Sequence, residues 1–445
     1  MEGFMNIKHA LRFIPAILVL LISPCTLFGA NGYFIHGAGA VNESLGGAAT
    51  AGNGSDLLGS LYRNPANATL FGDKAFSVSL EMLIPDLTVK SSVGILGLND
   101  SSDSDVDMIP SANMGMVLRN KNLPAAFYFG VIAEAGLHLD ISESTTNPVF
   151  IAQQGKANNP FGGLFGGFGA VETQLEVIRI PLGISYDYND KWSAGFSLAP
   201  SIARMMFTPA AFAAPDDANA DGIPTYPDDI DHDVSFGFGF QAGVRYKVTD
   251  DMNIGFTLTS PTWFEKFEWK TKDEAGQSRK VSFHLDRPLS LHVGANYRLP
   301  CETLLLMDVS WINYADTKGF DKTGFASDGS LKGLGFDDIY VVALGVQQTV
   351  QEKLTLRAGY NYCTNPIDED ITFFNVGSPL HNQHHLSIGA SWAVTKQAAI
   401  DFGYTHAFKS SQSGPMYTLA GKAPGTKVES EMAYEQIAVG VTVSY

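Results

Sequence analysis

A segment between Asp217 and Asp228 places oxygen-bearing side chains at the spacing of a calcium-binding loop. Asp217, Asn219 and Asp221 stand at positions 1, 3 and 5, Gly222 stands at position 6, and Asp228 stands at position 12. In an EF-hand loop these positions supply oxygen ligands, and the glycine permits the sharp turn. Aspartate replaces the usual glutamate at position 12, and two prolines interrupt the loop. The sequence leaves two interpretations open, a calcium site and an acidic solvated loop.

The sequence offers no comparable pattern for catalysis. We find no nucleophile, base and orienting acid at a recognisable spacing, and the adjacent His384 and His385 would lie on opposite faces of a strand. We therefore expect a protein that is not an enzyme and that requires no cofactor. The net charge of -17 argues against a nucleic-acid partner, because phosphates are neutralised by basic patches.

The last ten residues alternate with period two. Ile437, Val439, Val441, Val443 and the terminal Tyr445 form one apolar face, and small or polar residues form the other. Lipid-facing and lumen-facing side chains alternate in this way in the strands of outer-membrane barrels. The end of the chain therefore predicts a membrane-spanning β-strand.

The N-terminus is typical of a secreted protein. Lys8 and Arg12 precede an apolar run at residues 13–21, and small residues at 28–30 offer a cleavage site. We interpret residues 1–30 as a signal peptide.

Residues 75–445 contain alternating segments separated by two kinds of connection, one short and polar, the other long. The long connections centre near residues 97, 155, 220, 275, 328, 372 and 420, and the two kinds alternate strictly. This pattern predicts an all-β fold, a transmembrane antiparallel β-barrel of about 14 strands. Within its strands, Met307 and Val309 should face lipid and Asp308 the lumen.

Residues 31–74 are rich in glycine and lack this alternation. A barrel of about 14 strands encloses more space than its own side chains fill. We therefore predict that this segment forms a small hatch, or plug, inside the lumen.

The hatch sequence Arg63-Asn64-Pro65-Ala66, followed by Phe71, resembles the Asn-Pro-Ala motif of the long-chain fatty acid transporter (FadL/TodX) family. Similar places follow along nearly the whole mature chain, including Leu356-Arg357-Ala358-Gly359-Tyr360. The resemblance implies a monomeric 14-stranded barrel in the lipid of a bacterial outer membrane. It also implies an N-terminal hatch and a hydrophobic tunnel that opens sideways through a kinked strand.

By the same resemblance, the kinked strand is residues 127–137. Glu134 and Gly136 interrupt its alternation and indicate a bulge or a gap in pairing, unless the strand simply ends there. The resemblance also places Tyr33, with Phe34 beside it, near a high-affinity pocket. The alternative is a mobile tail without a role.

The loop at residues 147–170 carries six large apolar side chains among glycines. Phe161, Phe165 and Phe168 are the aromatic members that we expect to form a capture groove for a greasy ligand, unless they only pack against neighbouring loops.

Three arginines, Arg179, Arg245 and Arg357, fall on the inward phase of their strands. A guanidinium pairs well with a carboxylate head group, and we assign ligand binding to Arg179 and Arg357. Lumenal aspartates such as Asp308 and Asp401 would otherwise neutralise these cations.

The function that we predict is passive uptake of hydrophobic small molecules, with long-chain fatty acids as the first candidate. The alternatives are a channel for aromatic hydrocarbons, a general porin, and a barrel enzyme that acts on lipids through a serine near His284, His292 or His406.

Overall fold

The computed structural model describes residues 31–119 and 123–445. The expected signal peptide at residues 1–30 and most of the predicted turn at residues 120–123 lie outside the described residues. Among the residues that are described, no helix is long and apolar enough to cross a membrane.

Fourteen antiparallel strands of the described chain close a barrel, which confirms the predicted fold. β21 pairs with β1 along its whole length and completes the ring. In order around the wall the strands are β1 (Lys74–Val93), β3 (Ile109–Arg119), β4 (Ala125–Ile141), β5 with β6 (Val171–Arg179 and Leu182–Asp187), β7 (Trp192–Thr208), β8 (Asp233–Lys247), β9 with β10 (Met252–Thr259 and Trp263–Phe264), β13 (Ser290–Arg298), β14 (Leu304–Ile312), β15 (Ile339–Gln351), β16 (Leu354–Cys363), β17 (His384–Ala393), β18 (Ala398–Gly414) and β21 (Thr426–Ser444).

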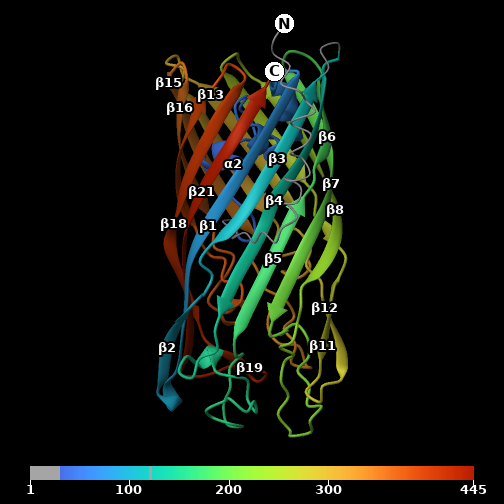
Figure 1. Cartoon of the computed structure of the whole chain (residues 1–445), viewed down its shortest axis with the longest axis vertical. Helices are drawn as coiled ribbons and strands as arrows, with labels where there is room; N and C mark the ends of the chain where they lie inside the picture. Colours follow the sequence, from blue (N-terminus) through green and yellow to red (C-terminus); the bar gives the residue numbers. More distant parts are fainter. Residues whose placement is uncertain (1–30, 120–122) are drawn as a thin grey trace.

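The connections alternate between short turns at one end of the barrel and long loops at the other (Figure 1). The long loops contain their own small elements. These are β2 (Leu98–Asp103), the hairpins β11–β12 (Phe267–Lys272 and Ser278–Phe283) and β19–β20 (Tyr417–Thr418 and Gly421–Lys422), and the 3-10 turns η2 (Gly94–Leu96), η3 (Pro148–Phe150) and η4 (Phe373–Asn375). The end with the short turns carries Tyr445 and the start of β1, so it is the periplasmic end of an outer-membrane barrel.

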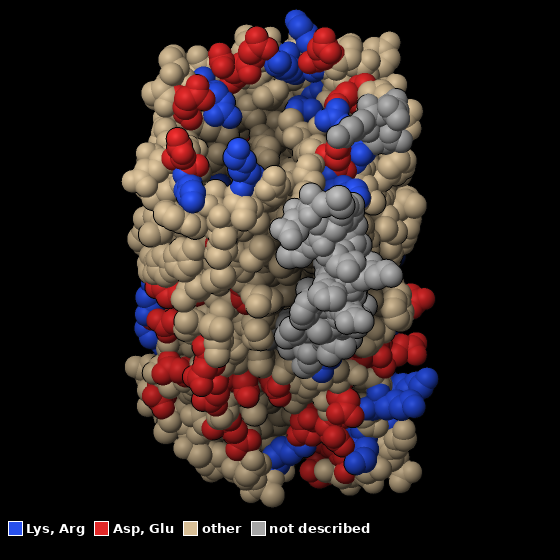
Figure 2. Space-filling view, turned by 45° about the horizontal axis from the view of Figure 1, so that its top comes forward, with Lys and Arg blue, Asp and Glu red and all other residues tan. Residues whose placement is uncertain are grey.

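The outer wall is apolar where period-two alternation predicts lipid contact. Met307 and Val309 are 48% and 42% exposed, whereas Asp308 between them is 4% exposed. On the face that Figure 2 shows, a band with few charges crosses the barrel between two charged rims. This distribution suits a wall that faces hydrocarbon in its middle and water or head groups at both ends.

The hatch precedes β1 and lies inside the barrel. It contains α2 (Gly39–Glu43), α3 (Leu57–Arg63) and the 3-10 helix η1 (Pro65–Leu70). Nearly all of its residues are buried, although glycine-rich sequence provides little core of its own. The barrel wall therefore supplies most of the surface against which the hatch packs.

Glycines of the wall make this packing close. Four cross-strand pairs, which we call the glycine belt, face the hatch: Gly195–Gly243, Gly255–Gly294, Gly345–Gly359 and Gly389–Gly403. A β-carbon on Gly359 would lie 2.1 Å from the backbone nitrogen of Gly46, and one on Gly255 would lie 2.1 Å from the carbonyl oxygen of Thr50. The hatch backbone thus touches the wall at positions where a side chain would collide with it.

Hydrogen bonds fix the hatch at the same level. Asp308 of β14 accepts from the backbone nitrogens of Ala49 and Thr50, both at 2.9 Å, and from the Thr50 hydroxyl at 2.7 Å. Asn64 donates to the carbonyl oxygens of Thr50 (2.8 Å) and Val244 (3.1 Å), and its Oδ1 accepts from the nitrogen of Ala66. The Asn-Pro-Ala motif therefore joins the hatch to β8.

We predict that Gly359→Val will displace the hatch without opening the barrel wall. Overpacking of this kind costs about 1–3 kcal/mol, and the strain falls on the contact with Gly46. Single-channel recording should show a higher conductance than the wild-type protein. Ala358→Val is the matched control, because Ala358 is the next residue along β16 and points to the opposite face. Equal conductance of Gly359→Val and wild type would contradict the prediction.

Candidate functional site

The wall is incompletely paired between β3 and β4. The ladder between them joins Met114–Arg119 to Ala126–Val131, although β3 begins at Ile109 and β4 continues to Ile141. Beyond the ladder, the Ala133 nitrogen donates to Asn113 Oδ1 at 2.9 Å, and the Asp105 nitrogen donates to the Asp140 carbonyl at 2.7 Å. A lateral gap in backbone pairing therefore lies between Asn113 and the outer end of β4.

β4 has a bulge at this gap, where its register on β5 shifts between Ala133 and Ala135. The residue between them, Glu134, is fully buried. A bulge adds one residue to a strand and re-aims a side chain, here toward the lumen. On the other side of β4, Pro181 separates β5 from β6, so the neighbouring strand is also interrupted.

The N-terminal segment covers the inner side of the gap. Phe34 forms a β-bridge with Ala135, the Ile35 nitrogen donates to the Glu134 carbonyl at 3.1 Å, and the Gly136 nitrogen donates to the Tyr33 carbonyl at 3.3 Å. Both residues expected at the gate, Glu134 and Gly136, therefore contact the segment that contains Tyr33 and Phe34.

An apolar cavity lies beside this segment. Leu175, Val177, Phe264, Phe267 and Phe320 are among its lining residues, together with Tyr33, Phe34, Asp286 and Arg287. A second cavity has more polar residues in its lining, which include Tyr62, Arg63, Ser290, His292 and Ser310. Phe34 and Arg287 line both cavities. They therefore stand where an apolar chamber meets a polar one.

Outer-loop aromatics hold the N-terminal segment in place. Tyr33 packs on Phe320 and Phe336, with ring centroids 5.1 and 5.8 Å apart. The Tyr314 hydroxyl donates to the Asn31 carbonyl and accepts from the Tyr33 nitrogen, both at 3.0 Å. Burial raises the pKa of Tyr314, so the hydroxyl keeps the proton that it donates. Tyr33 and Phe34 are therefore ordered parts of the site.

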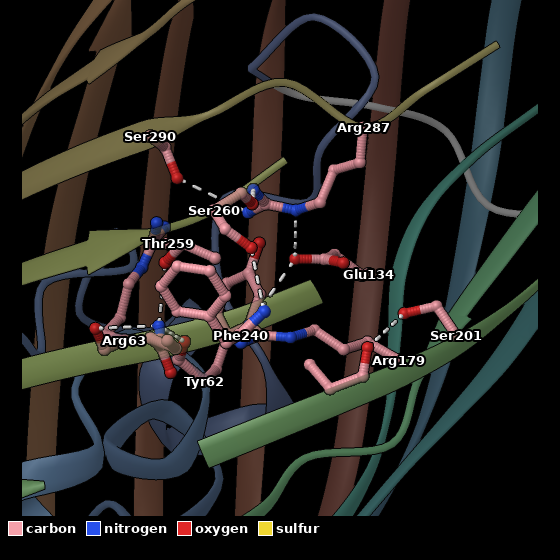
Figure 3. Close-up of polar contacts among 12 residues, drawn as sticks. Tyr62, Arg63, Glu134, Arg179, Ser201, Phe240, Thr259, Ser260, Arg287 and Ser290 are labelled. Atoms are coloured by element: carbon pink, nitrogen blue, oxygen red, sulfur yellow. Dashed lines mark hydrogen bonds and ion pairs between the residues drawn. The ribbon is translucent and has the colours of Figure 1, made fainter. Parts of the chain in front are cut away.

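Glu134 links two buried arginines at the gap (Figure 3). Its Oε1 accepts from Arg287 Nε at 3.0 Å and lies 3.7 Å from Arg179 Nη1. Arg287 also donates to the carbonyls of Ser260 and Pro288, and its guanidinium lies 4.7 Å from the centroid of the Phe34 ring. Arg179 Nη2 is buried and has no hydrogen-bond partner among the described residues. One carboxylate thus serves two guanidiniums next to the apolar cavity.

The other inward arginines lie elsewhere. Arg357 contacts Gln347, Ser391 and the hatch residue Ser55 near the periplasmic end of the barrel, and it lines neither cavity. Arg245 donates to Ser193 and lies 3.8 Å from Asp187. The geometry therefore places Arg179 at the site and gives Arg357 contacts with the wall and the hatch.

Some apolar side chains of the loop at residues 147–170 pack against other aromatic rings, and one is exposed to solvent. Phe168 packs on Tyr226 and Phe373, with centroids 6.2 and 5.5 Å apart, and Phe161 packs edge-on against Phe165 at 6.0 Å. All three phenylalanines are half-buried, and Leu164 at the tip of the loop is 91% exposed. The expected capture groove stays a prediction, with Leu164 as its most accessible apolar side chain.

The side-chain oxygens of the calcium-like loop accept hydrogen bonds from the loop backbone or pair with a lysine. The Gly222 nitrogen donates to Asp217, the Asp221 nitrogen donates to Asn219, and Asp228 pairs with Lys156 of a neighbouring loop at 3.0 Å. Within the described residues, no group of three or more His, Cys, Asp or Glu side chains is arranged to hold a metal ion. Calcium binding stays a prediction that would require Asp228 to leave Lys156.

The three histidines considered for a barrel enzyme make contacts that differ from those of a catalytic triad. Both ring nitrogens of His292 face hydroxyls, Ser310 at 2.6 Å and Ser290 at 3.1 Å. His284 pairs with Asp286 at 3.0 Å, and His406 pairs with Glu435 at 2.7 Å. A hydrolytic site would need a histidine with a serine on one ring nitrogen and an acid on the other. Both ring nitrogens of His292 face serine hydroxyls.

Sequence reasoning did not identify Arg287, Tyr314 or Phe320 as site residues. All three lie in the long connections between strands, where period-two alternation gives no direction for a side chain. The pair Arg287-Pro288 is a local signal, because a residue before proline is held extended, but nothing in the sequence aims it at Glu134.

Comparison with known proteins agrees with this architecture. A family model described as "Outer membrane protein transport protein (OMPP1/FadL/TodX)" matches residues 26–445. A long-chain fatty acid transport protein from Escherichia coli O6:H1 is 23% identical over 406 residues, which cover 82% of this chain and 84% of that protein. A second relative with the same description, from Salmonella typhi, is 23% identical over 390 residues, covering 81% and 84%.

Solved structures share the fold at low identity. The toluene transporter TodX of P. putida superposes with a TM-score of 0.66 at 16% identity, covering 92% of this chain and 99% of that one. A FadL homologue of Pseudomonas aeruginosa gives a TM-score of 0.68 at 14% identity, covering 93% and 99%. The closed barrel, the internal hatch and the family match over nearly the whole chain lead to one conclusion: the chain belongs to the OMPP1/FadL/TodX family of outer-membrane transport proteins.

Proposed function

We propose that this protein takes up long-chain fatty acids across the outer membrane and releases them sideways into the membrane through the gap between β3 and β4. Family membership alone supports transport of hydrophobic small molecules across the outer membrane, because this is what members of the family do. The ligand class and the route are our inference.

The meeting of the two cavities at Phe34 and Arg287 carries the proposal. A fatty acid has an apolar tail, for which Phe264, Phe267 and Phe320 offer apolar contacts, and a carboxylate that suits Arg287. Arg179 offers a further N–H group without a partner in the described chain. A hydrocarbon would fill the apolar cavity and leave these donors unused, so the geometry supports an amphipathic ligand.

The position of the gap supports lateral release. The gap lies at the level of the apolar cavity, since Ala135 of β4 lines that cavity and bridges to Phe34. The hatch, by contrast, fills the lumen on the periplasmic side and is fixed by the glycine belt. A ligand that moves past Phe34 toward β4 therefore reaches the wall before it reaches periplasmic water.

A general porin is disfavoured by this packing, because the hatch residues are almost all buried inside the barrel. A hydrocarbon channel is the second candidate, supported by the largely apolar lining of the cavity.

We predict that Arg287→Gln will weaken oleate binding and leave toluene binding unchanged. A hydrogen bond to a charged group contributes about 1.5–3 kcal/mol, so the oleate dissociation constant should rise by about 10- to 100-fold. Isothermal titration calorimetry of the detergent-purified protein measures both ligands. Arg357→Gln is the matched control, since Arg357 is an equally buried lumenal arginine away from both cavities. Toluene binding alone in the wild type would favour the hydrocarbon channel, and equal effects of both variants would contradict a head-group role for Arg287.

We predict that deletion of Glu134 will block uptake while ligand binding continues. The deletion removes the extra residue of the bulge, so that β4 can pair regularly and narrow the gap. Glu134→Gln is the matched control, because it also removes the carboxylate but keeps the bulge. Uptake of radiolabelled oleate by cells should fall at least about tenfold more in the deletion than in the control, a change equivalent to about 1.4 kcal/mol in the barrier. Equal uptake by the two variants would mean that the ligand leaves by another route.

A further inference from the structure

Two buried carboxyl groups, outside the cavities, join the hatch to the wall beside the lateral gap. Glu43 ends α2, Glu81 lies in β1, and they are 1% and 3% exposed. They belong to one cluster, because Glu81 accepts from the nitrogen of Gly39 at the start of α2, the short helix that ends with Glu43. Neither forms an ion pair with a cation of the described chain within 4.0 Å. Two buried carboxyl groups in one cluster without a cation cannot both be ionised at low cost, so one of the two holds a proton.

The surrounding donors show which carboxyl group holds the proton. Glu81 accepts from the Gly39 nitrogen at 2.9 Å, from Asn113 Nδ2 at 2.6 Å and from the Ser111 hydroxyl at 3.4 Å. Glu43 accepts one bond, from Gln436 Nε2 at 2.5 Å. The group with more donors is the better site for the negative charge. Glu43 is therefore the protonated member of the pair, and Glu81 is the ionised one.

Asn113 extends this contact to the gap. Its Nδ2 donates to Glu81, and its Oδ1 accepts from the Ala133 nitrogen at 2.9 Å. Ala133 immediately precedes the bulge in β4, and Asn113 lies in β3, just beyond the end of the ladder with β4. A chain of hydrogen bonds thus runs from the hatch helix through Glu81 and Asn113 to the opposite edge of the gap.

We propose that the Glu43–Glu81 pair is a proton-dependent latch that ties the hatch to both edges of the lateral gap, and that loss of the bound proton loosens the edge at Ala133. When both groups are ionised they repel each other inside the wall. The role in transport rests on the proposed lateral release, whereas the latch itself is a property of the folded protein.

The wall side chains around the pair are uncharged, so they add no charge to that of the two carboxyl groups. Gln436 and Tyr434 face it from β21, Ser79 lies beside Glu81 in β1, and Ser111 faces it from β3. On the hatch, His36 faces the Thr405 hydroxyl through Nε2, and burial lowers its pKa to about 4. Asp56 accepts from Asn42, the neighbour of Glu43, and burial raises the pKa of Asp56 to about 7. Asp56 is therefore the titratable group that the experiment must separate from the pair.

The direction of the pH effect follows from the proton count. The latched pair holds one proton, whereas a glutamate in water titrates near pH 4.3 and holds almost none at neutral pH. The latched state therefore binds more protons than the released state, so it loses stability as the pH rises above about 4.3. One proton changes the equilibrium by at most about tenfold per pH unit.

Hydrogen exchange of the detergent-purified, full-length mature protein tests the latch directly. Protection of a peptide that covers residues 132–137 is measured at about pH 5 and about pH 8. It is divided by the protection of a β14 peptide, which corrects for the intrinsic pH dependence of exchange. In the wild type we expect this ratio to fall by at least about tenfold at the higher pH. A ratio that does not change with pH would overturn the proposal.

Glu43→Gln separates the pair from other titrating groups, because its amide is uncharged at every pH. The ratio in this variant should be high and independent of pH, with Asp56 intact. Asp56→Asn is the matched control, since Asp56 is another buried hatch carboxyl group, which accepts from Asn42 and Gly59. It should keep the wild-type slope. If Glu43→Gln also keeps that slope, the titrating group is not this pair, and the proposal is overturned.

A second variant guards against misfolding of the first. Asn113→Ala leaves the carboxyl pair in place and removes its connection to Ala133, so residues 132–137 should exchange quickly at both pH values. Protection in this variant equal to that of the wild type would also overturn the proposal. Oleate uptake is recorded separately: a latch that responds to pH without an effect on uptake would contradict lateral release and leave the latch standing.

Discussion

The close contact between the hatch backbone and the glycine belt is the constraint on which the rest of this structure depends. A 14-stranded barrel is wide enough to leak, and the short glycine-rich hatch cannot build a core of its own. The wall resolves both problems, because paired glycines such as Gly345 and Gly359 let backbone approach backbone. The hatch gains burial and the pore is filled by the same contact.

Two different sets of contacts hold the hatch, one at its middle and one at its first residues. Asp308 and Asn64 hold the middle of the hatch with several hydrogen bonds each. Residues 33–35 are held differently, by single backbone bonds to the bulged β4 and by the Tyr314 hydroxyl. The part of the chain nearest the cavity is therefore fixed by contacts of its own, and it covers the lateral gap.

Much of the barrel followed from the sequence, because alternation with period two is a local property. It predicted the strand phase around Asp308 and the long and short connections, and the family resemblance located the interrupted strand in which the bulge at Glu134 lies. Alternation shows that a side chain points inward but not at what depth it meets another element. For this reason the sequence analysis assigned the same role to Arg179 and Arg357, although only Arg179 lies at the gap. The partners Glu134 and Arg287 stand 153 residues apart, and no local pattern connects them.

Energetics explain why a gap in the wall suits a greasy ligand better than a pore through the hatch. About 0.8 kcal/mol favours each buried CH₂, so a tail of sixteen such groups would lose about 13 kcal/mol on entering periplasmic water. Opening the gap costs the few hydrogen bonds that span it, such as those of Ala133 and Ile35, each worth about 1 kcal/mol net. For the lateral release that we propose, the unpaired stretch of wall therefore costs less free energy than passage into periplasmic water. A barrel that loses a few backbone hydrogen bonds at β4 can keep its hatch bound to the remaining strands of the wall.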